Sequence, residues 1–251
     1  MNIDVTMTAT LRKNIVAKTL SSFKRMFTPD HEYTLYLNID PIGEDIFPEE
    51  IYLIAKQYFN KVIPNYPKTH GFCSAFKWCI ENTTSDVVFH LEDDWELIRP
   101  FNINSLVHIM DIHSHSLGSI RLNRGFVILR DVHTLDLKTS MGDQVEKISM
   151  INNLFRLGYV LHPDVSFNPG LFNGDYIRKV SRQLIPPKNP EDQFLQMYHN
   201  KEWDKIPNLA QAIYVGDGFD IVTRDIGRNW MKDSRYDKPD SGFVFWKERK
   251  K

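Results

Sequence analysis

Cysteine is almost absent from this chain of 251 residues, which contains only Cys73 and Cys79. Both lie in one predicted helix without a CxxC spacing, so the sequence predicts neither a disulfide framework nor a zinc site, and a reducing compartment fits best. Residues 1–7 have no charged n-region or long apolar run of the kind found in secretory signals. No segment reaches the roughly 18 continuous apolar residues of a membrane span. We therefore expect a soluble, cytoplasmic protein.

Charge of one sign is not in excess either. Lysines and arginines number 31 against 32 acids, which gives a formal charge of -1, so no global field favours nucleic acid or an anionic membrane. Common catalytic signatures are missing too: there is no Walker A loop, GxGxxG, GxSxG or HExxH motif. What remains is 42% hydrophobic and 25% charged residues without internal repeats or a convincing linker, which predicts one globular domain over residues 1–251.

Strand-like and helix-like segments alternate through the first hundred or so residues. Short β-rich runs are predicted at 3–10, 33–39 and 61–63, with a turn at 40–43. Apolar residues at helical spacing follow each run: Val16, Leu20, Phe23 and Phe27; Ile51, Ile54, Ala55, Tyr58 and Phe59; Phe72, Ala75, Phe76, Cys79 and Ile80 after Gly71. This alternation predicts an α/β fold with a mostly parallel sheet and helices on both faces.

Beyond Pro100 the alternation is less regular. We expect a helix at 103–113, strands at 119–122 and 126–129, a loop over 131–144, and helices at 176–183 and 191–199. The last of these follows the stiff, proline-rich residues 186–190.

The most informative segment is an apolar run that ends in three acids, Glu92, Asp93 and Asp94. Val87 and its neighbours read as a buried strand, and open α/β sheets bind ligands beyond the carboxyl ends of their strands. Adjacent carboxylates repel one another unless a cation lies between them, and such oxygens suit Mg²⁺ or Mn²⁺ holding a diphosphate. The alternative is a solvated acidic loop.

Two other motifs accompany this cluster. Residues 7–12 end the first strand with small polar side chains that let a flat base approach, and Asp40 ends the neighbouring second strand. Glu191 and Asp192 open a later helix, where the helix dipole favours the ionised carboxylates.

In this order, the three motifs resemble glycosyltransferases of the GT-A fold, particularly the inverting, family-two-like enzymes, over nearly the whole chain. The resemblance implies a Rossmann-like sheet, a nucleotide-binding half at 1–100, and an acceptor-binding half at 101–251 with a C-terminal lid. It also implies a nucleotide-diphosphate sugar as donor, with uridine favoured, and Mn²⁺ or Mg²⁺ as the cofactor.

The same resemblance implies roles for the residues at the donor site. Thr8, Thr10 and Asp40 would lie beside the base and ribose, with Arg12 nearby. Asp94 would be the main metal ligand, and Asp93 would face the ribose or a metal-bound water. The competing interpretation makes Thr8 and Thr10 plain strand residues and Asp40 an ordinary turn residue before proline.

Further roles concern the acceptor and the lid. Asp192 would be the catalytic base, with Glu191 as its substitute, although Asp192 could merely cap its helix. Residues 167–175 resemble the family's donor or acceptor loop and include Asp175, but they also fit a glycine-rich turn. Arg224, Arg228 and Trp230 suit a C-terminal lid that clamps phosphate and stacks on a flat ring.

The chemistry implied is a single displacement. A metal ion at Asp94 would offset charge on the departing diphosphate, and Asp192 would deprotonate an acceptor hydroxyl as it attacks the anomeric carbon with inversion. The chain departs from the family in two respects. It has no Gln-x-x-Arg-Trp motif after the base, which favours transfer of one sugar over polymer synthesis. It also offers Asp217 where the family often has a histidine ligand, which puts the metal shell in doubt.

The acceptor is less clear from the sequence. We expect its pocket at 126–144, 168–175 and 186–192, and a glycan or surface polysaccharide precursor as the acceptor. The alternative acceptor is a hydroxymethylated DNA base, which predicts a basic groove from Arg121, Arg124, Arg130 and Lys188. A nucleotidyltransferase and a non-catalytic nucleotide-sugar-binding module are the rival functions.

Overall fold

The computed structural model describes residues 1–124, 159–161, 166–202, 204–207, 209–214, 221–234, 236–237 and 247–248. The predicted strand at 126–129, the predicted loop at 131–144, and the side chains of Arg130 and Asp217 lie outside these residues.

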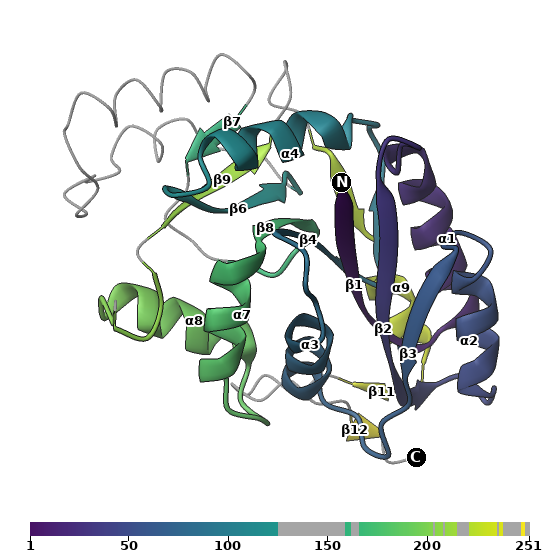
Figure 1. Cartoon of the computed structure of the whole chain (residues 1–251). Coiled ribbons are helices and arrows are strands. Elements are labelled where there is room, and N and C mark those ends of the chain that lie inside the picture. Colours follow the sequence, from purple (N-terminus) through teal and green to yellow (C-terminus); the bar gives the residue numbers. More distant parts are fainter. Residues whose placement is uncertain are drawn as a thin grey trace.

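An eight-stranded sheet forms the centre of the molecule (Figure 1). Six strands run in one direction, because β1 is parallel to β2 and β4, β2 to β3, and β6 to β9, while β8 is antiparallel to both β4 and β6. Only β8 and the edge strand β7 oppose them. The mostly parallel α/β sheet predicted from the sequence is confirmed. In spatial order the strands are β3 (Lys61–Asn65), β2 (Glu32–Gly43), β1 (Asn2–Leu11), β4 (Val87–Glu92), β8 (Gly170–Asn173), β6 (Leu117–Leu122), β9 (Ala210–Tyr214) and β7 (Tyr159–Leu161).

Helices cover both faces of this sheet (Figure 1). The larger apolar cluster packs three helices on one face: α1 (Lys13–Phe23), α2 (Pro48–Ala55) and α4 (Ile103–Ile112). The second cluster packs three on the other: α3 (Phe72–Glu81), α7 (Gly174–Gln183) and α8 (Pro190–His199). A short 3₁₀ turn, η1 (Lys24–Met26), follows α1. None of the helices in the described part of the chain combines the length and apolar character that crossing a membrane requires.

Strand β4 contributes to both clusters because its side chains alternate between the two faces of the sheet. Phe89 and Leu91 belong to the larger cluster and Val88 to the second. His90, also fully buried, accepts or donates one hydrogen bond between its Nδ1 and Thr6 Oγ1 at 2.9 Å, and its ring lies 4.9 Å from that of Phe76. A strand buried on both faces explains the continuous apolar run in the sequence.

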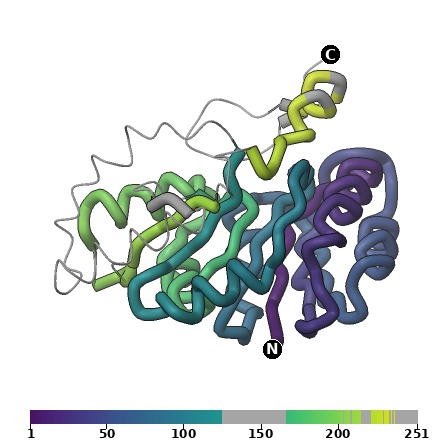
Figure 2. Tube along the Cα trace, turned by 90° about the horizontal axis from the view of Figure 1, so that it is seen from above, coloured from purple at the N-terminus to yellow at the C-terminus, as the bar shows by residue number. Residues whose placement is uncertain are grey.

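Asp93 and Asp94 form the acidic turn that follows β4, and a small second sheet lies directly after it. Strand β5 (Trp95–Leu97) pairs antiparallel with β10 (Thr223–Asp225), and α9 (Gly227–Asp233) follows β10. A third pair, β11 (Tyr236–Asp237) with β12 (Lys247–Glu248), comes later in the chain. Figure 2 shows this C-terminal segment at the end of the molecule opposite the N-terminus. The pairing of β5 with β10 therefore brings the C-terminal segment to the carboxyl ends of the parallel strands.

Two local predictions were wrong. The expected turn at 40–43 is the end of β2, which continues to Gly43 with a register shift opposite Leu11. Gly43 has a φ of +134°, and a Cβ there would lie 2.4 Å from the carbonyl oxygen of Leu11, so this close approach requires glycine. Residues 170–173, expected to be loop or turn, form the antiparallel strand β8 in the middle of the sheet.

Candidate functional site

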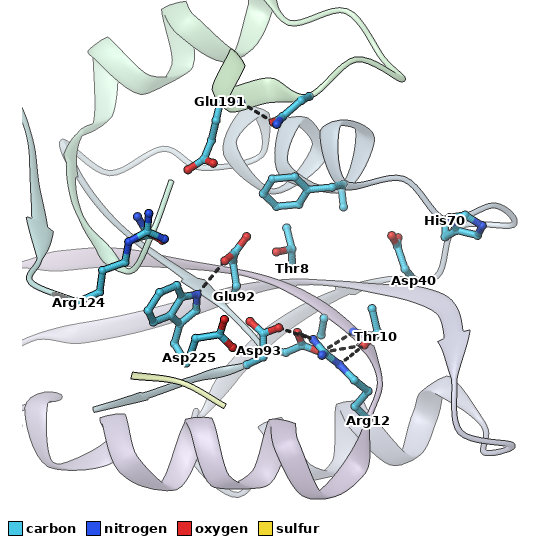
Figure 3. Close-up of a pocket in the computed structure, with 17 residues that line it drawn as sticks. Thr8, Thr10, Arg12, Asp40, His70, Glu92, Asp93, Arg124, Glu191 and Asp225 are labelled. Atoms are coloured by element: carbon cyan, nitrogen blue, oxygen red, sulfur yellow. Dashed lines mark hydrogen bonds and ion pairs between the residues drawn. The ribbon is translucent and has the colours of Figure 1, made fainter. Parts of the chain in front are cut away.

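A cavity of about 330 Å³ opens at the carboxyl ends of β1, β2 and β4, where the sequence places its polar residues (Figure 3). This volume is within the range of small-molecule sites. The acidic turn and the start of α8 line it together, as the transferase hypothesis requires. The lining residues are Thr8, Ala9, Thr10, Arg12, Asp40, His70, Phe72, Ala75, Glu92, Asp93, Asp94, Trp95, Arg124, Asn168, Asn189, Glu191 and Asp225.

The acidic turn is fixed through the backbone of Asp93. Its amide donates to the carbonyl of Thr8 at 3.1 Å, and its carbonyl accepts a hydrogen bond from Thr19 Oγ1 at 2.6 Å. Its carboxylate accepts from the amide and hydroxyl of Thr10 at 2.8 and 3.0 Å. The turn that ends β4 is thereby attached to both β1 and α1. The Asp93 side chain is therefore engaged in holding the turn in place, and Thr10 is one of its hydrogen-bond partners.

Arg12 is the cation of this turn. Its side chain is 3% exposed, and its guanidinium forms an ion pair with Asp93 and a second one, 3.1 Å long, with Asp94 Oδ2. Its Nε also donates to Thr10 Oγ1 at 2.7 Å. Burial by itself lowers the pKa of Arg12, but the two carboxylates outweigh that effect and raise the pKa above its ordinary value. Arg12 therefore stays charged and holds the two aspartates.

Asp94 is the more accessible of the two aspartates, with 18% of its side chain exposed against 4% for Asp93. Its carbonyl accepts a hydrogen bond from the amide of Ile226 at 2.8 Å. Gly227 lies so close that a Cβ there would be 2.3 Å from Asp94 Oδ2. The start of α9 thus packs directly against this carboxylate and limits where it can point.

One end of the cavity is built around Asp40. Its Oδ1 accepts from Asn38 Nδ2 at 2.7 Å and its Oδ2 from the amide of Gly71 at 2.9 Å, so the carboxylate joins the end of β2 to the start of α3. Burial raises the pKa of Asp40 above its ordinary value. His70 and Phe72 flank Gly71 and also line the cavity. A flat ring would find an aromatic wall and a fixed carboxylate here.

The opposite side of the cavity carries Glu191 (Figure 3). Its Oε1 accepts hydrogen bonds from Ser166 Oγ at 2.9 Å and from the amide of Phe167 at 2.7 Å, which fixes the carboxylate. Asp192 is exposed and is not among the lining residues, because successive helical residues point about 100° apart. Of the two acids proposed as base, the structure brings only the substitute, Glu191, to the cavity.

Arg124 extends into the cavity between Glu92 and Glu191 (Figure 3). Its guanidinium lies 5.9 Å from the centre of the Trp95 ring and donates to Asn168 Oδ1 at 2.9 Å. Trp95 in turn donates its indole N–H to Glu92 Oε2 at 2.8 Å. These contacts form a polar wall between the acidic turn and α8.

Other predicted site residues lie elsewhere. Arg224 is exposed and pairs with Glu96, and Arg228 is exposed and pairs with Asp225; neither lines the cavity. Asp175 lines a different cavity of about 450 Å³ that also includes Met1. Trp230 lies over Arg12, with the guanidinium carbon 5.2 Å from its ring centre, so its ring contacts a protein cation. The phosphate and acceptor roles of these residues stay predictions.

Several lining residues were not assigned to the donor site from the sequence. Phe72 was interpreted only as part of an apolar helix face, and Arg124 only as part of a DNA groove. Asn168 was placed only in the acceptor loop 168–175, and His70 and Asp225 were not singled out. A usable signal existed for His70 and Phe72, since they surround the glycine that begins a helix next to a strand-end aspartate.

The lining fits a divalent cation only in part. In the described part of the chain, no group of three or more His, Cys, Asp or Glu side chains is arranged to hold a metal ion. Mg²⁺ is commonly held by one or two carboxylates together with substrate phosphates, however, and Asp94 can supply such a carboxylate. A metal site here would therefore be completed by a diphosphate.

The cavity is acidic, with six carboxylates (Asp40, Glu92, Asp93, Asp94, Glu191, Asp225) against two guanidiniums (Arg12, Arg124), an excess of four negative charges. Four basic residues were expected to form a DNA groove. Among the described residues, Arg124 lines the cavity, whereas Arg121 and the exposed Lys188 do not. This distribution of charge does not favour a nucleic-acid acceptor.

No protein-family model and no curated protein matches the chain. Among solved structures, S. aureus TarS matches 90% of this chain and 36% of its own, at 10% identity and a TM-score of 0.54. TarS 1-349 in complex with UDP-GlcNAc matches 89% of this chain and 58% of its own, at 12% identity and a TM-score of 0.54. TarS 1-349 in complex with UDP matches 89% of this chain and 60% of its own, at 11% identity and a TM-score of 0.53.

TarS is a GT-A glycosyltransferase of family 2, so these matches confirm the GT-A fold predicted for this chain. The chain spans between 36% and 60% of the lengths of these three solved chains.

Proposed function

We propose that this protein is an inverting, metal-assisted glycosyltransferase that moves one sugar from a UDP-sugar to an acceptor hydroxyl. The observation that carries the proposal is that one cavity is lined by a strand-end aspartate, by the acidic turn and, on the other side, by the carboxylate of Glu191. Its fold is that of TarS, which has been crystallised with UDP-GlcNAc. UDP-GlcNAc is therefore the first donor to test, and a glycan or surface polysaccharide precursor is the proposed acceptor.

The donor is expected to bind with its uracil beside Asp40 and Phe72 and its ribose beside Thr8 and Thr10. The fixed carboxylate of Asp40 can accept a hydrogen bond from the base, and an aromatic side chain can pack on its face. The diphosphate would then lie above the acidic turn. Because the cavity carries an excess of negative charge, a diphosphate needs a cation to bind there.

Asp94 is the residue proposed to hold that cation, since it is the more exposed acid of the turn. A bound Mn²⁺ or Mg²⁺ would supply positive charge to the departing diphosphate. Arg124 is the second source of positive charge near the sugar, held in place by Asn168 and the Trp95 ring.

Glu191 is proposed as the general base. Its carboxylate is fixed by Ser166 and Phe167 on the side of the cavity opposite the acidic turn, so it can receive the proton of an acceptor hydroxyl as that oxygen attacks the anomeric carbon. The C1–diphosphate bond breaks as the C1–oxygen bond forms, and the configuration at C1 inverts without a covalent intermediate.

The test is donor hydrolysis with water as the acceptor. The protein is incubated with Mn²⁺ and a panel of UDP-, GDP- and dTDP-sugars, and release of nucleotide and sugar is followed by NMR, which also reports the anomeric configuration before mutarotation. We expect one UDP-sugar to be hydrolysed with inversion and Asp94→Ala to abolish the reaction. Release of pyrophosphate from a nucleoside triphosphate would instead favour a nucleotidyltransferase. Binding of the donor without any turnover would favour a non-catalytic module.

A further inference from the structure

Three segments that are distant in sequence meet on the guanidinium of Arg12. The acidic turn contributes Asp93 and Asp94, the end of β1 contributes Thr10, and α9 contributes the ring of Trp230. Trp230 is itself stacked on Tyr236, with the ring planes 13° apart. A guanidinium held on so many sides cannot move away without disturbing each of these contacts.

This arrangement affects the oxygen that a metal ion would use. Arg12 donates to Asp94 Oδ2 at 3.1 Å, and both carboxylate oxygens of Asp93 already accept hydrogen bonds, from Arg12 and Thr10. The carbonyl of Asp94 is also engaged, by the amide of Ile226. Gly227 packs against the carboxylate of Asp94 and restricts its rotation.

From these contacts we infer that Arg12 is a positioning residue that prevents the acidic turn from binding a divalent cation on its own, so that the metal binds only together with the donor diphosphate. A metal ion at Asp94 would lie close to the fixed positive charge of Arg12, which repels it. A diphosphate adds negative charge and further oxygen ligands, which offsets that repulsion and completes the coordination shell. The inference rests on the proposed function, because it names the diphosphate as the partner.

Mn²⁺ binding can be measured without any turnover. Free Mn²⁺ is titrated into the protein and quantified by its EPR signal, first without nucleotide and then with UDP. For the wild-type protein we expect UDP to tighten Mn²⁺ binding by at least about tenfold. Replacing Arg12 by the uncharged Met (Arg12→Met) should let Mn²⁺ bind at least about tenfold more tightly than in the wild type when UDP is absent. Arg12→Lys keeps the charge and should resemble the wild type.

Controls address folding and specificity. Removal of Arg12 leaves the buried Asp93 without its partner, so Arg12→Met can unfold the protein. The double variant Arg12→Met/Asp93→Asn removes both members of that pair and retains Asp94, and it should show the same gain in affinity for Mn²⁺ alone. Lys205→Met removes an exposed cation paired with Glu202 that does not line the cavity, and it should leave Mn²⁺ binding unchanged.

The outcomes separate this inference from the proposed function. If the wild type and the folded variants that lack the positive charge of Arg12 bind Mn²⁺ equally well without UDP, the role given to Arg12 is wrong even when UDP binds and donor is hydrolysed. If UDP fails to bind the wild type at any Mn²⁺ concentration, the proposed function is wrong. The comparison of Mn²⁺ alone between wild type and variants still decides what Arg12 does.

Discussion

Glu191 and Asp93 line opposite sides of one cavity, although one lies in the first turn of α8 and the other directly follows β4 (Figure 3). Asp93 is buried and bonded to Arg12 and Thr10, whereas Glu191 is held by Ser166 and Phe167 through one carboxylate oxygen. The two carboxylates therefore differ in what they can do. Asp93 shapes the turn, and Glu191 can receive a proton.

Glu191→Gln should reduce donor hydrolysis by about 10² to 10⁴-fold, the usual contribution of a general base. The Gln side-chain oxygen can still accept the hydrogen bonds from Ser166 and Phe167, so UDP binding and the melting temperature should stay close to wild type. Asp192→Asn is the matched control, because this neighbour is exposed and does not line the cavity. A large loss in Asp192→Asn with an active Glu191→Gln would reverse the assignment.

Asp94→Asn should abolish Mn²⁺ binding in the presence of UDP and lower donor hydrolysis by at least about a hundredfold, since a charged ligand of the metal becomes neutral. EPR measures the first effect and nucleotide release the second. Glu96→Gln is the control: this acid lies two residues further along the chain and pairs with Lys18 and Arg224. Retention of Mn²⁺ binding in Asp94→Asn would place the metal on another ligand.

Gly227→Ala should displace the Asp94 carboxylate, because the new Cβ would lie 2.3 Å from Asp94 Oδ2. Small-to-large changes in packed sites typically cost about 1–3 kcal/mol, so we expect a lower melting temperature together with weaker Mn²⁺ binding in the presence of UDP. Lys232→Ala changes an exposed side chain on the same helix and should have little effect on Mn²⁺ binding. Equal Mn²⁺ affinities in wild type and Gly227→Ala would show that Asp94 tolerates the displacement.

UDP binding should weaken as the pH falls through the pKa of Asp40, which burial raises above the ordinary value for aspartate. Protonation removes the negative charge that accepts a hydrogen bond from the base, so the loss should begin at a higher pH than for an exposed aspartate. Isothermal titration calorimetry at several pH values measures it. Asp40→Asn should bind UDP more weakly and without this pH dependence. An unchanged dependence in that variant would assign the titration to another group.

The free energy of unfolding should depend on pH through His90. Burial lowers the pKa of His90 to about 3, whereas in the unfolded chain the pKa of histidine is close to its ordinary value of 6.5. The contribution of His90 to the free energy of unfolding is fully present above about pH 6.5 and is lost as the pH falls toward 3. In that range the histidine binds a proton in the unfolded state but not in the folded state. The free energy of unfolding should fall by about 1.4 kcal/mol per pH unit in this window, up to about 4 to 5 kcal/mol.

Urea unfolding at several pH values checks this slope. His90→Asn can keep the hydrogen bond to Thr6 and should remove the slope attributable to this histidine, although the smaller side chain lowers stability at every pH. His108→Gln changes an exposed histidine on α4 and should keep the wild-type slope. A slope that survives in His90→Asn would mean that other groups produce it.

The sequence was sufficient for the parts of the fold that depend on local patterns. The apolar run before Glu92 identified β4 and the position of the acids at its carboxyl end, because side-chain alternation and strand length are local properties. Asp40 was found in the same way, as the last polar residue of a neighbouring parallel strand. These two positions already located the cavity.

Other features depended on contacts between distant segments. Whether Glu191 or Asp192 enters the cavity is decided by how α8 docks on Ser166 and Phe167, and no local pattern encodes that rotation. The antiparallel direction of β8 had a similar effect: it brings Asn168, which precedes the strand, to the cavity and carries Asp175, which follows it, to the other edge of the sheet.

The role of Arg12 was also not available from the sequence. A cation at the end of a strand can bind a ligand phosphate or a protein carboxylate, and only the three-dimensional arrangement brings both Asp93 and Asp94 to the Nη2 atom of Arg12. The structure favours the second role for this side chain.

The pairing of β5 with β10 makes the cavity dependent on the last part of the chain. A protein shortened to end before residue 221 would lose Asp225 from the cavity, the packing of Gly227 on Asp94 and the ring above Arg12 in one step. The acidic turn would then be open to solvent on that side. Truncation from this end should therefore impair catalysis even though the eight-stranded sheet is left whole.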